Sequence, residues 1–513
     1  MSVSTICILV VIVAYLCIVI GVGIRFAKGN ESSSDFYLGG RKLGPYVTAM
    51  SAEASDMSSY LLMGLPGLAY LSGIADCGWT IIGLAVGTYL NWLFTARRLR
   101  RYSQVTGAYT LPQFFSKRYH DERNILGMIA AVVIIVFFVP YTASGFAACG
   151  KLFNSLFGLN YTIGMALAAI VIVGYTTAGG FLAASTTDFI QSIVMTIALL
   201  FILIFSTISA GGIGAVISNA QSLPGYFSMF ATYSETTGTS SPYTFLTIIT
   251  TLSWGLGYFG MPHILLRFMA IENESKLKVS RRVASVWVVI AMFIALAIGI
   301  IGKAMSSQGL IASLSGSDTE TIIVVISNLV ASFGPIPALM AGIVLAGILA
   351  STMSTADSQL LAASSSVSED ILKGGFKLKL SERQSMFAAR AIVVVIAILG
   401  VIIAQDPDSS VFGIVSFAWA GFGAAFGPLM ILSLYWKKTT LAGGVAGMAA
   451  GGIMVFVWKY LVRPMGGVWD LYELLPAFIV GIVVIVVVSL LTQKENPEID
   501  AEFEKAKSSV ELN

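Results

Sequence analysis

The sequence has few charged residues. Only 11% of its 513 residues are Asp, Glu, Lys or Arg, whereas soluble globular domains contain roughly 25%. Hydrophobic residues make up 56%, and the mean hydropathy is +0.85. A net charge of +3 gives no basis for nucleic-acid binding. The composition therefore excludes an ordinary soluble protein and predicts a polytopic membrane protein.

The chain also lacks the common catalytic and metal-binding motifs. Its four cysteines form no CxxC pair and lie in or beside apolar stretches, so we expect free thiols. Its two histidines, His120 and His263, are too far apart in the sequence to suggest a metal site. No P-loop, GxSxG, HExxH or Rossmann fingerprint is present. We therefore expect neither ATP-driven transport nor an enzyme.

What the sequence does contain is a series of long apolar stretches. The first, Ile6–Ile24, has no basic segment before it and no signal-cleavage site, so we expect a retained span. A membrane-crossing helix needs about 20 apolar residues. By that measure the candidate spans are about 4–24, 45–71, 76–96, 124–149, 160–183, 188–210, 242–269, 281–303, 335–366, 386–404, 410–435, 439–462 and 470–492.

Lys and Arg gather in alternate loops between these spans. Most of the 30 lie in 25–44, 97–123, 267–282, 373–383, 437–438 and 494–507. The other side has only Lys151, Lys303, Lys459 and Arg463. Because basic loops stay in the cytoplasm, we predict a plasma-membrane protein with its N-terminus outside and its C-terminus inside. An odd number of spans agrees with that orientation.

One apolar stretch, Ser51–Gly67, carries polar residues that a simple membrane anchor lacks. It contains Glu53, Asp56 and a Gly-x-Pro-Gly motif at 64–67. Ionisable groups within a span are costly and usually line a cavity or an ion path. Gly and Pro within a span free backbone carbonyls, which a bilayer tolerates only beside protein or water. We therefore predict a broken helix that lines a transport path.

A second stretch, Ser253–His263, also combines helix-weakening residues with aromatic ones. The helix-weakening residues are Gly255, Gly257, Gly260 and Pro262. Trp254 and Tyr258 are four residues apart, which predicts one helical face. Glycines also allow close packing of membrane helices, so the glycines alone leave that alternative open. However, the two stretches open spans two and seven, and interrupted helices at matching positions of two halves favour a transporter binding site.

A third stretch, in the ninth span, places hydroxyl groups along one helical face. Four residues follow the spacing i, i+3, i+4, i+7: Ser351, Ser354, Thr355 and Ser358. Single hydroxyl residues often only join membrane helices. Four on one face, with Asp357 beside them, suit a hard cation, because such cations take oxygen ligands. The stretch predicts a sodium site of low formal charge, opposite the carbonyls of a broken helix.

Three further residues each have two open interpretations. Tyr141 either faces the cavity or satisfies a neighbouring helix. Asp188, at the start of the sixth span, is either a helix cap, our preferred interpretation, or a carboxylate on the inner ion path. Arg41 shortly precedes the broken helix and is either an inner gate or an anchor at the membrane surface.

Four motifs resemble the sodium/solute symporter family and, within it, the bacterial proline carriers. They are Asp35-Phe-Tyr-Leu-Gly-Gly-Arg41, Ser55-Asp-Met-Ser58 with Leu61-Leu-Met-Gly-Leu-Pro-Gly67, Trp254-Gly-Leu-Gly-Tyr-Phe-Gly260 with Pro262-His-Ile-Leu265, and Ser354-Thr-Ala-Asp-Ser-Gln-Leu-Leu361. The match extends over nearly the whole chain. The resemblance implies an all-α polytopic fold of about thirteen transmembrane helices, with a LeuT-type 5+5 inverted-repeat core, one helix before it and two after it.

The resemblance also implies a role for each matching residue. Sodium would be bound by the backbone carbonyls of Ala54, Met57 and Ser351 and by the hydroxyls of Ser354 and Thr355. The substrate pocket would be lined by Ser58, Tyr60, Tyr141, Trp254, Tyr258 and Pro262. Asp56 would be the carboxylate of sodium coupling, and Asp188 would lie on the inward release path. Arg41 would stay the candidate gate.

One departure from the family pattern concerns the substrate. Proline carriers are expected to have Gly-Trp after the position of Ser58, whereas this chain has Ser59-Tyr60. The ring of Tyr60 is smaller and more polar than that of the expected Trp. This difference leaves the class of transporter unchanged but bears on whether the cargo is proline.

The predicted organisation follows from the spans and the repeat. We divide the chain into a first helix with its inner loop (1–44), a first repeat (45–210), an outer loop (211–241), a second repeat (242–436), two peripheral helices (437–493) and an inner tail (494–513).

The predicted function is sodium-coupled uptake of a small amino acid by alternating access, with L-proline as the first candidate. Another amino acid, a small carboxylate, or protons in place of sodium remain alternatives within transport. An ion channel is the rival from another class, although it would need a continuous pore. A membrane-embedded enzyme is disfavoured because the spans contain no paired catalytic residues.

Overall fold

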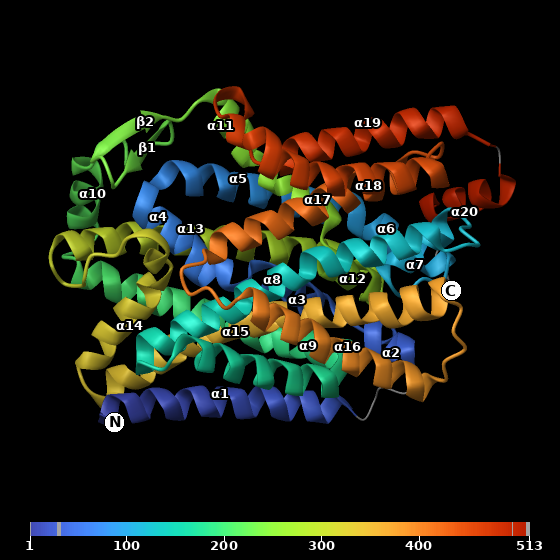
Figure 1. Cartoon of the computed structure of the whole chain (residues 1–513). Coiled ribbons are helices and arrows are strands. Elements are labelled where there is room, and N and C mark those ends of the chain that lie inside the picture. Colours follow the sequence, from blue (N-terminus) through green and yellow to red (C-terminus); the bar gives the residue numbers. More distant parts are fainter. Residues whose placement is uncertain (1, 28–31, 495, 509–513) are drawn as a thin grey trace.

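The computed structural model describes residues 2–27, 32–494 and 496–508, apart from the side chains at 178 and 382. Lys28, which the sequence analysis counted in an inner loop, and the last five residues of the predicted tail lie outside the described residues. Most helices run side by side along one direction (Figure 1). We call the two ends of this bundle the α10 end and the α20 end, after short helices that lie there.

The chain is helical throughout except for one hairpin in the described residues. The helices and strands are α1 (Val3–Ala27), α2 (Ser33–Leu38), η1 (Gly39–Arg41), α3 (Pro45–Ser59), η2 (Tyr60–Gly64), α4 (Leu65–Ser72), α5 (Ile74–Leu90), η3 (Asn91–Thr95), α6 (Ala96–Val105), α7 (Leu111–Arg118), α8 (Ile125–Phe157), α9 (Tyr161–Ser209), α10 (Ile213–Ser222), β1 (Ala231–Ser234), β2 (Thr239–Pro242), α11 (Phe245–Leu252), η4 (Ser253–Gly260), α12 (Pro262–Ala270), η5 (Glu274–Lys276), α13 (Leu277–Ser307), η6 (Gly316–Thr321), α14 (Ile322–Ser332), α15 (Pro335–Ser365), η7 (Ser366–Gly375), α16 (Glu382–Ile403), α17 (Val411–Tyr435), α18 (Leu441–Val457), η8 (Trp458–Val462), η9 (Arg463–Met465), η10 (Gly467–Trp469), α19 (Leu474–Thr492) and α20 (Pro497–Lys507).

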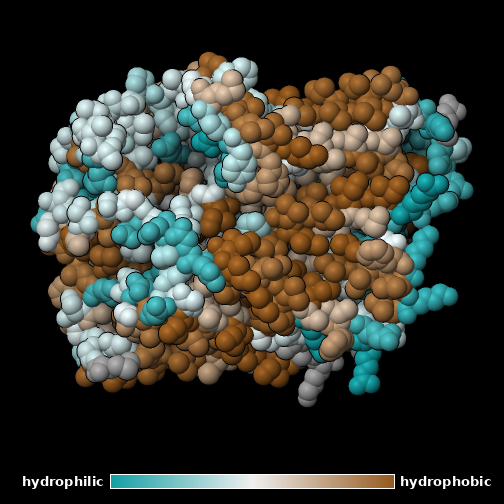
Figure 2. Space-filling view, in the orientation of Figure 1, coloured by the Kyte–Doolittle hydropathy of each residue, from teal (hydrophilic) through white to brown (hydrophobic). Residues whose placement is uncertain are grey.

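Ten helices in the described residues are long and apolar enough to cross a membrane. The other three predicted spans are present as shorter or interrupted pieces: α3 with η2 and α4, Tyr161–Thr177 of α9, and α11 with η4 and α12. The predicted total of about thirteen therefore holds. Figure 2 shows the hydrophobic residues as a broad belt between two more polar ends, as a lipid-embedded surface requires.

Two of the predicted spans join without a loop in α9. The helix is broken at Gly180, whose φ of 68° and ψ of −169° lie outside the helical region. Tyr161 donates to the carbonyl of Ala404, and Arg390 donates to the carbonyl of Thr177. The first half of α9 therefore runs antiparallel to α16. A glycine tolerates the positive φ that such a junction needs, so one residue replaces the predicted loop.

The helix α15 lies at the centre of the bundle. It packs against α1, α3, α8 and α9, and its residues from Leu345 to Ser365 are buried. Its sequence in this part is rich in Ala, Ser and Gly, and small side chains let neighbouring helices approach closely. The hydroxyl-rich stretch of the ninth span is therefore surrounded by protein.

The α10 end carries a pair of strands, β1 and β2, which are antiparallel with Ala231 opposite Pro242. Its strands belong to the segment predicted as the long outer loop. At the other end, α20 packs against α6. There the ring of Phe503 is buried, and the guanidinium carbon of Arg118 lies 5.3 Å from its centre.

Candidate transport site

The first predicted helix break is present, and it lies at Ser58. This residue has φ 50° and ψ −166°, so α3 loses its helical path there. A positive φ is rare and strained for a residue with a side chain, and such residues cluster at functional sites. The prediction that the Gly-x-Pro-Gly motif breaks the helix was wrong. Pro66 lies in the first turn of α4, and a Cβ on Gly67 would be 2.9 Å from the backbone of Glu320, so this glycine serves close packing.

The second predicted break is η4, a tighter 3-10 segment between α11 and α12. Its glycines also serve packing. A Cβ on Gly257 would lie 2.0 Å from Nε1 of Trp419, and one on Gly255 would lie 2.2 Å from the carbonyl oxygen of Gly83. The indole of Trp419 donates to the carbonyl of Trp254 at 2.8 Å. The glycines thus let α17 and α5 approach an interrupted helix. The two interpretations from the sequence, a helix break and close helix packing, are therefore compatible.

Four of the five predicted sodium ligands meet at the first break. The Ser354 hydroxyl donates to the carbonyl of Ala54 at 2.8 Å and to that of Ser351 at 3.2 Å. The Thr355 hydroxyl donates to the same Ser351 carbonyl at 3.1 Å. All four residues are buried. The Ser354 hydroxyl thus joins α15 to the broken end of α3, while the two bonds to the Ser351 carbonyl lie within α15. Neutral oxygens of this kind suit a hard cation.

The fifth predicted ligand, Met57, lies at the same break but is not joined to this cluster by a hydrogen bond. Its carbonyl accepts from the backbone N–H of Tyr60. Its side chain lines the cavity described next. The structure therefore places Met57 between the oxygen cluster and the cavity.

Asp56 lies buried in this region without a cationic partner among the described residues. One carboxylate oxygen accepts from the Tyr258 hydroxyl at 2.7 Å, and the other has no hydrogen-bond partner. The backbone carbonyl of Asp56 accepts from the Tyr141 hydroxyl at 3.3 Å. A buried charge without a partner is costly, so this carboxylate is suited to a cation or an amine brought by the cargo.

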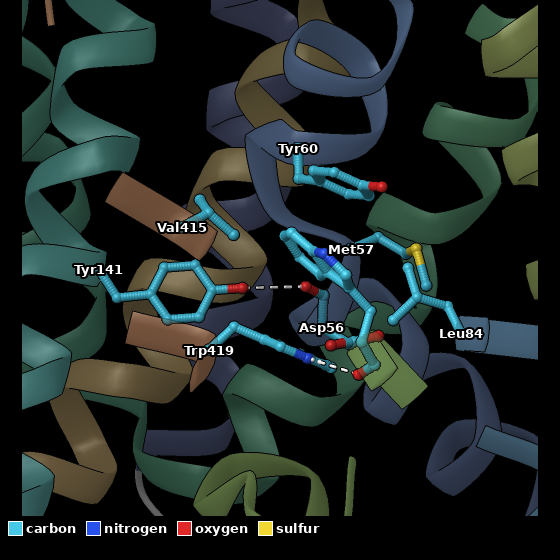
Figure 3. Close-up of a pocket in the computed structure, with 8 residues that line it drawn as sticks. Asp56, Met57, Tyr60, Leu84, Tyr141, Val415 and Trp419 are labelled. Atoms are coloured by element: carbon cyan, nitrogen blue, oxygen red, sulfur yellow. Dashed lines mark hydrogen bonds between the residues drawn. The ribbon is translucent and has the colours of Figure 1, made fainter. Parts of the chain in front are cut away.

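A narrow cavity, with about 10 Å³ of space for the centre of a water-sized sphere, adjoins Asp56. Figure 3 shows Tyr141 on one side of it and Leu84 on the other, with Tyr60 and Trp419 at opposite ends. The lining residues are Asp56, Met57, Tyr60, Leu84, Tyr141, Trp254, Val415 and Trp419. A cavity needs about 10–15 Å³ of such space to hold one water molecule, so the lining side chains must move apart before a solute can enter.

Aromatic rings form one end of the cavity. Tyr60 stacks with Trp254 at 5.9 Å between ring centres, and Phe412 lies 6.0 Å from Tyr60. Trp254 also stacks with Tyr472 at 5.0 Å. Sequence reasoning missed Phe412, Trp419 and Tyr472 because they come from α17 and the segment before α19, in spans that are otherwise plainly apolar. Trp419, an indole in mid-span between glycine-rich segments, was the one available signal.

Three predicted pocket residues, Ser58, Tyr258 and Pro262, do not line this cavity. Ser58 lines a neighbouring space that is too narrow to hold a water molecule, which Tyr141 and Thr355 also line. Its hydroxyl accepts from the Tyr60 backbone N–H at 3.1 Å. Pro262 starts α12 and is buried, but it does not line either space. Three of the six predicted pocket residues, Tyr60, Tyr141 and Trp254, line the cavity. A fourth, Tyr258, adjoins it because its hydroxyl donates to the Asp56 carboxylate.

Asp188 is buried in an ion pair with Arg267. The two side chains are 2.9 Å apart, and the Asp188 carboxylate also accepts from the Ser51 hydroxyl at 2.7 Å. Arg267 donates further to the hydroxyl of Ser358 at 2.6 Å. The preferred interpretation of Asp188 as a helix cap was wrong, because the second half of α9 begins before it at Gly180.

The assignment of Arg267 to an inner loop was also wrong, because this residue belongs to α12 and is 1% exposed. The count of basic residues that assigns loops to the inner side treats every Arg near the end of a span as a loop residue. An Arg whose charge is satisfied inside the bundle gives the same signal.

Arg41 bonds to protein and not to a membrane surface. Its guanidinium donates to the carbonyls of Met269 at 2.6 Å, Ser103 at 3.0 Å and Ala108 at 2.7 Å. These contacts join η1 to α6, α12 and the segment before α7. Nearby, the Tyr109 hydroxyl donates to Glu369 at 2.7 Å, and burial raises the pKa of Tyr109, so the donor keeps its proton. The α20 end is thus closed by polar contacts between separate elements.

Comparison with known proteins now decides the family. The model of the sodium:solute symporter family matches residues 36–451. The chain belongs to this family. It is 39% identical over 508 residues to the sodium/proline symporter of Staphylococcus aureus, covering 98% of this chain and 96% of that protein. It is 40% identical over 509 residues to the sodium/proline symporter of the strain USA300 / TCH1516, with the same coverage.

Solved structures establish the fold. A substrate-bound, outward-open Na+-coupled sialic acid symporter superposes with a TM-score of 0.78 at 19% identity, covering 96% of this chain and 99% of that one. Mhp1, a nucleobase-cation-symport-1 family transporter, gives 0.57 at 14% identity, covering 93% and 99%. The chain therefore has the LeuT-type inverted-repeat fold, as predicted. As a member of this family, it is a multi-pass membrane protein whose coupling ion is sodium.

Proposed function

We propose that this protein takes up L-proline together with sodium by alternating access. The observation that carries the proposal is the contact between the Ser354 hydroxyl and the Ala54 carbonyl, 2.8 Å apart at the helix break. This contact lies beside the cavity at Asp56. The sodium/proline symporters of Staphylococcus aureus, similar along almost the whole chain, support proline as the cargo.

In this proposal, sodium is bound between α3 and α15. The carbonyls of Ala54, Met57 and Ser351 and the hydroxyls of Ser354 and Thr355 supply five neutral oxygens. Sodium would replace the hydrogen bonds that now join Ser354 and Thr355 to those carbonyls. Because no carboxylate is among the ligands, the ion is bound without a strong charge pair and can leave on the inner side.

The amino acid would occupy the cavity beside the break once the side chains that line it move apart. The free carboxylate oxygen of Asp56 lies where it can accept from the amine of proline, and this also neutralises a buried charge. Tyr60 and Trp254 offer ring faces for the apolar pyrrolidine. The carboxylate of the amino acid would face the N-terminal end of a half-helix after a break, where backbone N–H groups are free. Tyr141 and Tyr258 hold the Asp56 side of the site through their hydroxyls.

The energetics of such coupling suffice for accumulation. One positive charge moving across 100 mV contributes ~2.3 kcal/mol, and a tenfold sodium gradient adds ~1.4 kcal/mol. Together these supply ~3.7 kcal/mol, which supports roughly 500-fold accumulation at one sodium per proline.

We further propose the orientation that the basic loops indicate, with the α10 end outside the plasma membrane and the α20 end inside. The repeats would then span 45–210 and 242–436, flanked by 1–44, the outer loop 211–241, the peripheral helices 437–493 and the inner tail 494–513. Arg41 acts as an inner gate because opening that end must break its contacts with α6 and α12. Asp188 lies on the inner ion path, and Arg267 must release it for sodium to interact with it.

The test of the cargo is uptake by the purified protein in vesicles, across a panel of amino acids and small carboxylates. Proline is expected to be taken up, and unlabelled proline should reduce the uptake of labelled proline more than any other compound does. Preferred uptake of another compound would replace proline while leaving the sodium site intact. Currents that flow with sodium and without any amino acid would instead support the channel.

A further inference from the structure

An apolar groove lies between α8, η7 and α18, away from the transport site. It has a volume of about 530 Å³, and its lining contains only Ile, Val, Met, Phe, Ala and Gly. Ala449 of α18 has a small side chain and Gly452 of α18 has none, while Val132 of α8 and Ile453 of α18 are 51% and 62% exposed. Both helices belong to membrane-spanning segments. An apolar groove at this level faces the hydrocarbon part of the bilayer.

Two cationic side chains flank the end of the groove that lies toward the loops of the α20 end. Ile125 and Phe376 line the groove. Arg123, two residues before Ile125, and Lys377, directly after Phe376, are exposed. The Asn124 amide donates to the carbonyl of Asp370 at 2.8 Å, which holds the two chain segments together. Within the described residues, Arg123 and Lys377 form no ion pair, in contrast to Lys373, which pairs with Glu369 at 2.9 Å.

We propose that this groove binds an anionic phospholipid of the membrane leaflet at the α20 end. One acyl chain lies along α8 and α18, and the phosphate lies between Arg123 and Lys377. Basic residues beside a membrane-spanning segment attract anionic headgroups, and a guanidinium can bind a phosphate through two hydrogen bonds. The charge at the mouth and the apolar lining thus match the two parts of one phospholipid. This proposal does not depend on the identity of the transported solute.

The position of the groove connects such a lipid to the transport site. The helix α8 also carries Tyr141, which lines the cavity, and η7 continues α15, which carries Ser354 and Thr355. A lipid bound here contacts both elements. It therefore stabilises one arrangement of α8 relative to α15.

The experiment uses photoreactive phospholipids with the purified, full-length protein in phosphatidylethanolamine vesicles. Phosphatidylglycerol and phosphatidylcholine, each with a diazirine in one acyl chain, are compared at equal amounts. Cross-links are expected on peptides that contain 125–136 and 448–456. Phosphatidylglycerol should label them about tenfold more than phosphatidylcholine, since two basic residues contact its headgroup.

Matched variants separate the headgroup from the groove. The double variant Arg123→Gln/Lys377→Gln should remove the preference for phosphatidylglycerol, whereas Lys278→Gln/Arg282→Gln, which changes exposed basic residues of α13, should keep it. Ala449→Phe fills the groove and should reduce labelling by both lipids. Ala450→Phe changes a neighbouring half-buried residue that does not line the groove and should not.

Three outcomes would overturn the proposal. Equal labelling by the two lipids would mean that the basic residues select no headgroup. Even labelling of α1, α16 and the groove would mean that no site exists. Protein–protein cross-links through 448–456 would mean that a second copy covers the face. The variant Arg123→Gln/Lys377→Gln changes only exposed side chains, so the test stays valid if Ala449→Phe fails to fold. Labelling needs no transport, so a failed uptake assay cannot produce these outcomes.

Discussion

Asp56 and Asp188 are both buried carboxylates in the membrane-spanning bundle, but their surroundings differ. Asp188 pairs with Arg267 at 2.9 Å and accepts from Ser51. Asp56 has one hydroxyl donor, Tyr258, and forms no ion pair among the described residues. Removal of one partner from a buried ion pair is destabilising because the other charge is left uncompensated. The carboxylate that lacks a cation is the one positioned to bind a charged cargo.

The largest expected effect is on stability and concerns the paired carboxylate. Arg267→Met should destabilise the protein by about 3–5 kcal/mol, because Asp188 is left as an uncompensated buried charge. Unfolding of the detergent-solubilised protein measures this. The double variant Asp188→Asn/Arg267→Met should recover part of the loss. If the single and double variants are equally unstable, the pair does not act as a unit.

The next effect is on transport and concerns the unpaired carboxylate. Asp56→Asn should lower proline uptake by about 100-fold, since the loss of a charge at a buried contact costs about 2–5 kcal/mol. Its unfolding should resemble that of the wild type, in contrast to Arg267→Met. Asp76→Asn, at the start of α5, is the matched control for transport. A stability loss in Asp56→Asn as large as that in Arg267→Met would remove the distinction between the two sites.

A smaller effect should separate the ion ligands from the carboxylates. Ser354→Ala or Thr355→Ala should raise the sodium concentration for half-maximal uptake by about tenfold, the equivalent of ~1.4 kcal/mol. Ser364→Ala should not, because Ser364 lies more than two helical turns along α15 from Ser354 and Thr355, and its hydroxyl donates to the Leu361 carbonyl. Equal shifts in all three variants would indicate a role in helix packing.

The smallest effect concerns the departure at Tyr60. Tyr60→Trp should change the KM for proline by roughly fivefold or less, because an indole can still stack on Trp254 and such contacts contribute about 0.5–1.5 kcal/mol. Competition by other amino acids against labelled proline measures selectivity in the same experiment. A complete change of the preferred amino acid would show that this ring selects the cargo.

The sequence allowed much of the ion site to be predicted because helical periodicity is readable. Ser351, Ser354 and Thr355 share a face by spacing alone, and the structure places Ser354 on the Ala54 carbonyl. The position of the break was less accessible. Ser58 has a positive φ although it is not a glycine, and only its tertiary surroundings hold it there.

The pocket was predicted in part, for a physical reason. Residues from the two interrupted helices could be found because polar or helix-weakening residues stand out in apolar spans. Trp419 and Phe412 could not, because they reach the cavity only through the packing of α17 against η4. Arg267 was misplaced because a satisfied buried charge and a loop charge look the same in sequence.

The most direct test of the account is the dependence of proline uptake on sodium in vesicles that contain only this protein. With an inward sodium gradient at fixed pH, labelled proline should accumulate above its external concentration. With choline in place of sodium, accumulation should disappear, and Ser354→Ala should need more sodium to restore it. Accumulation that is unchanged in choline would contradict the claim that sodium at the α3 break drives transport.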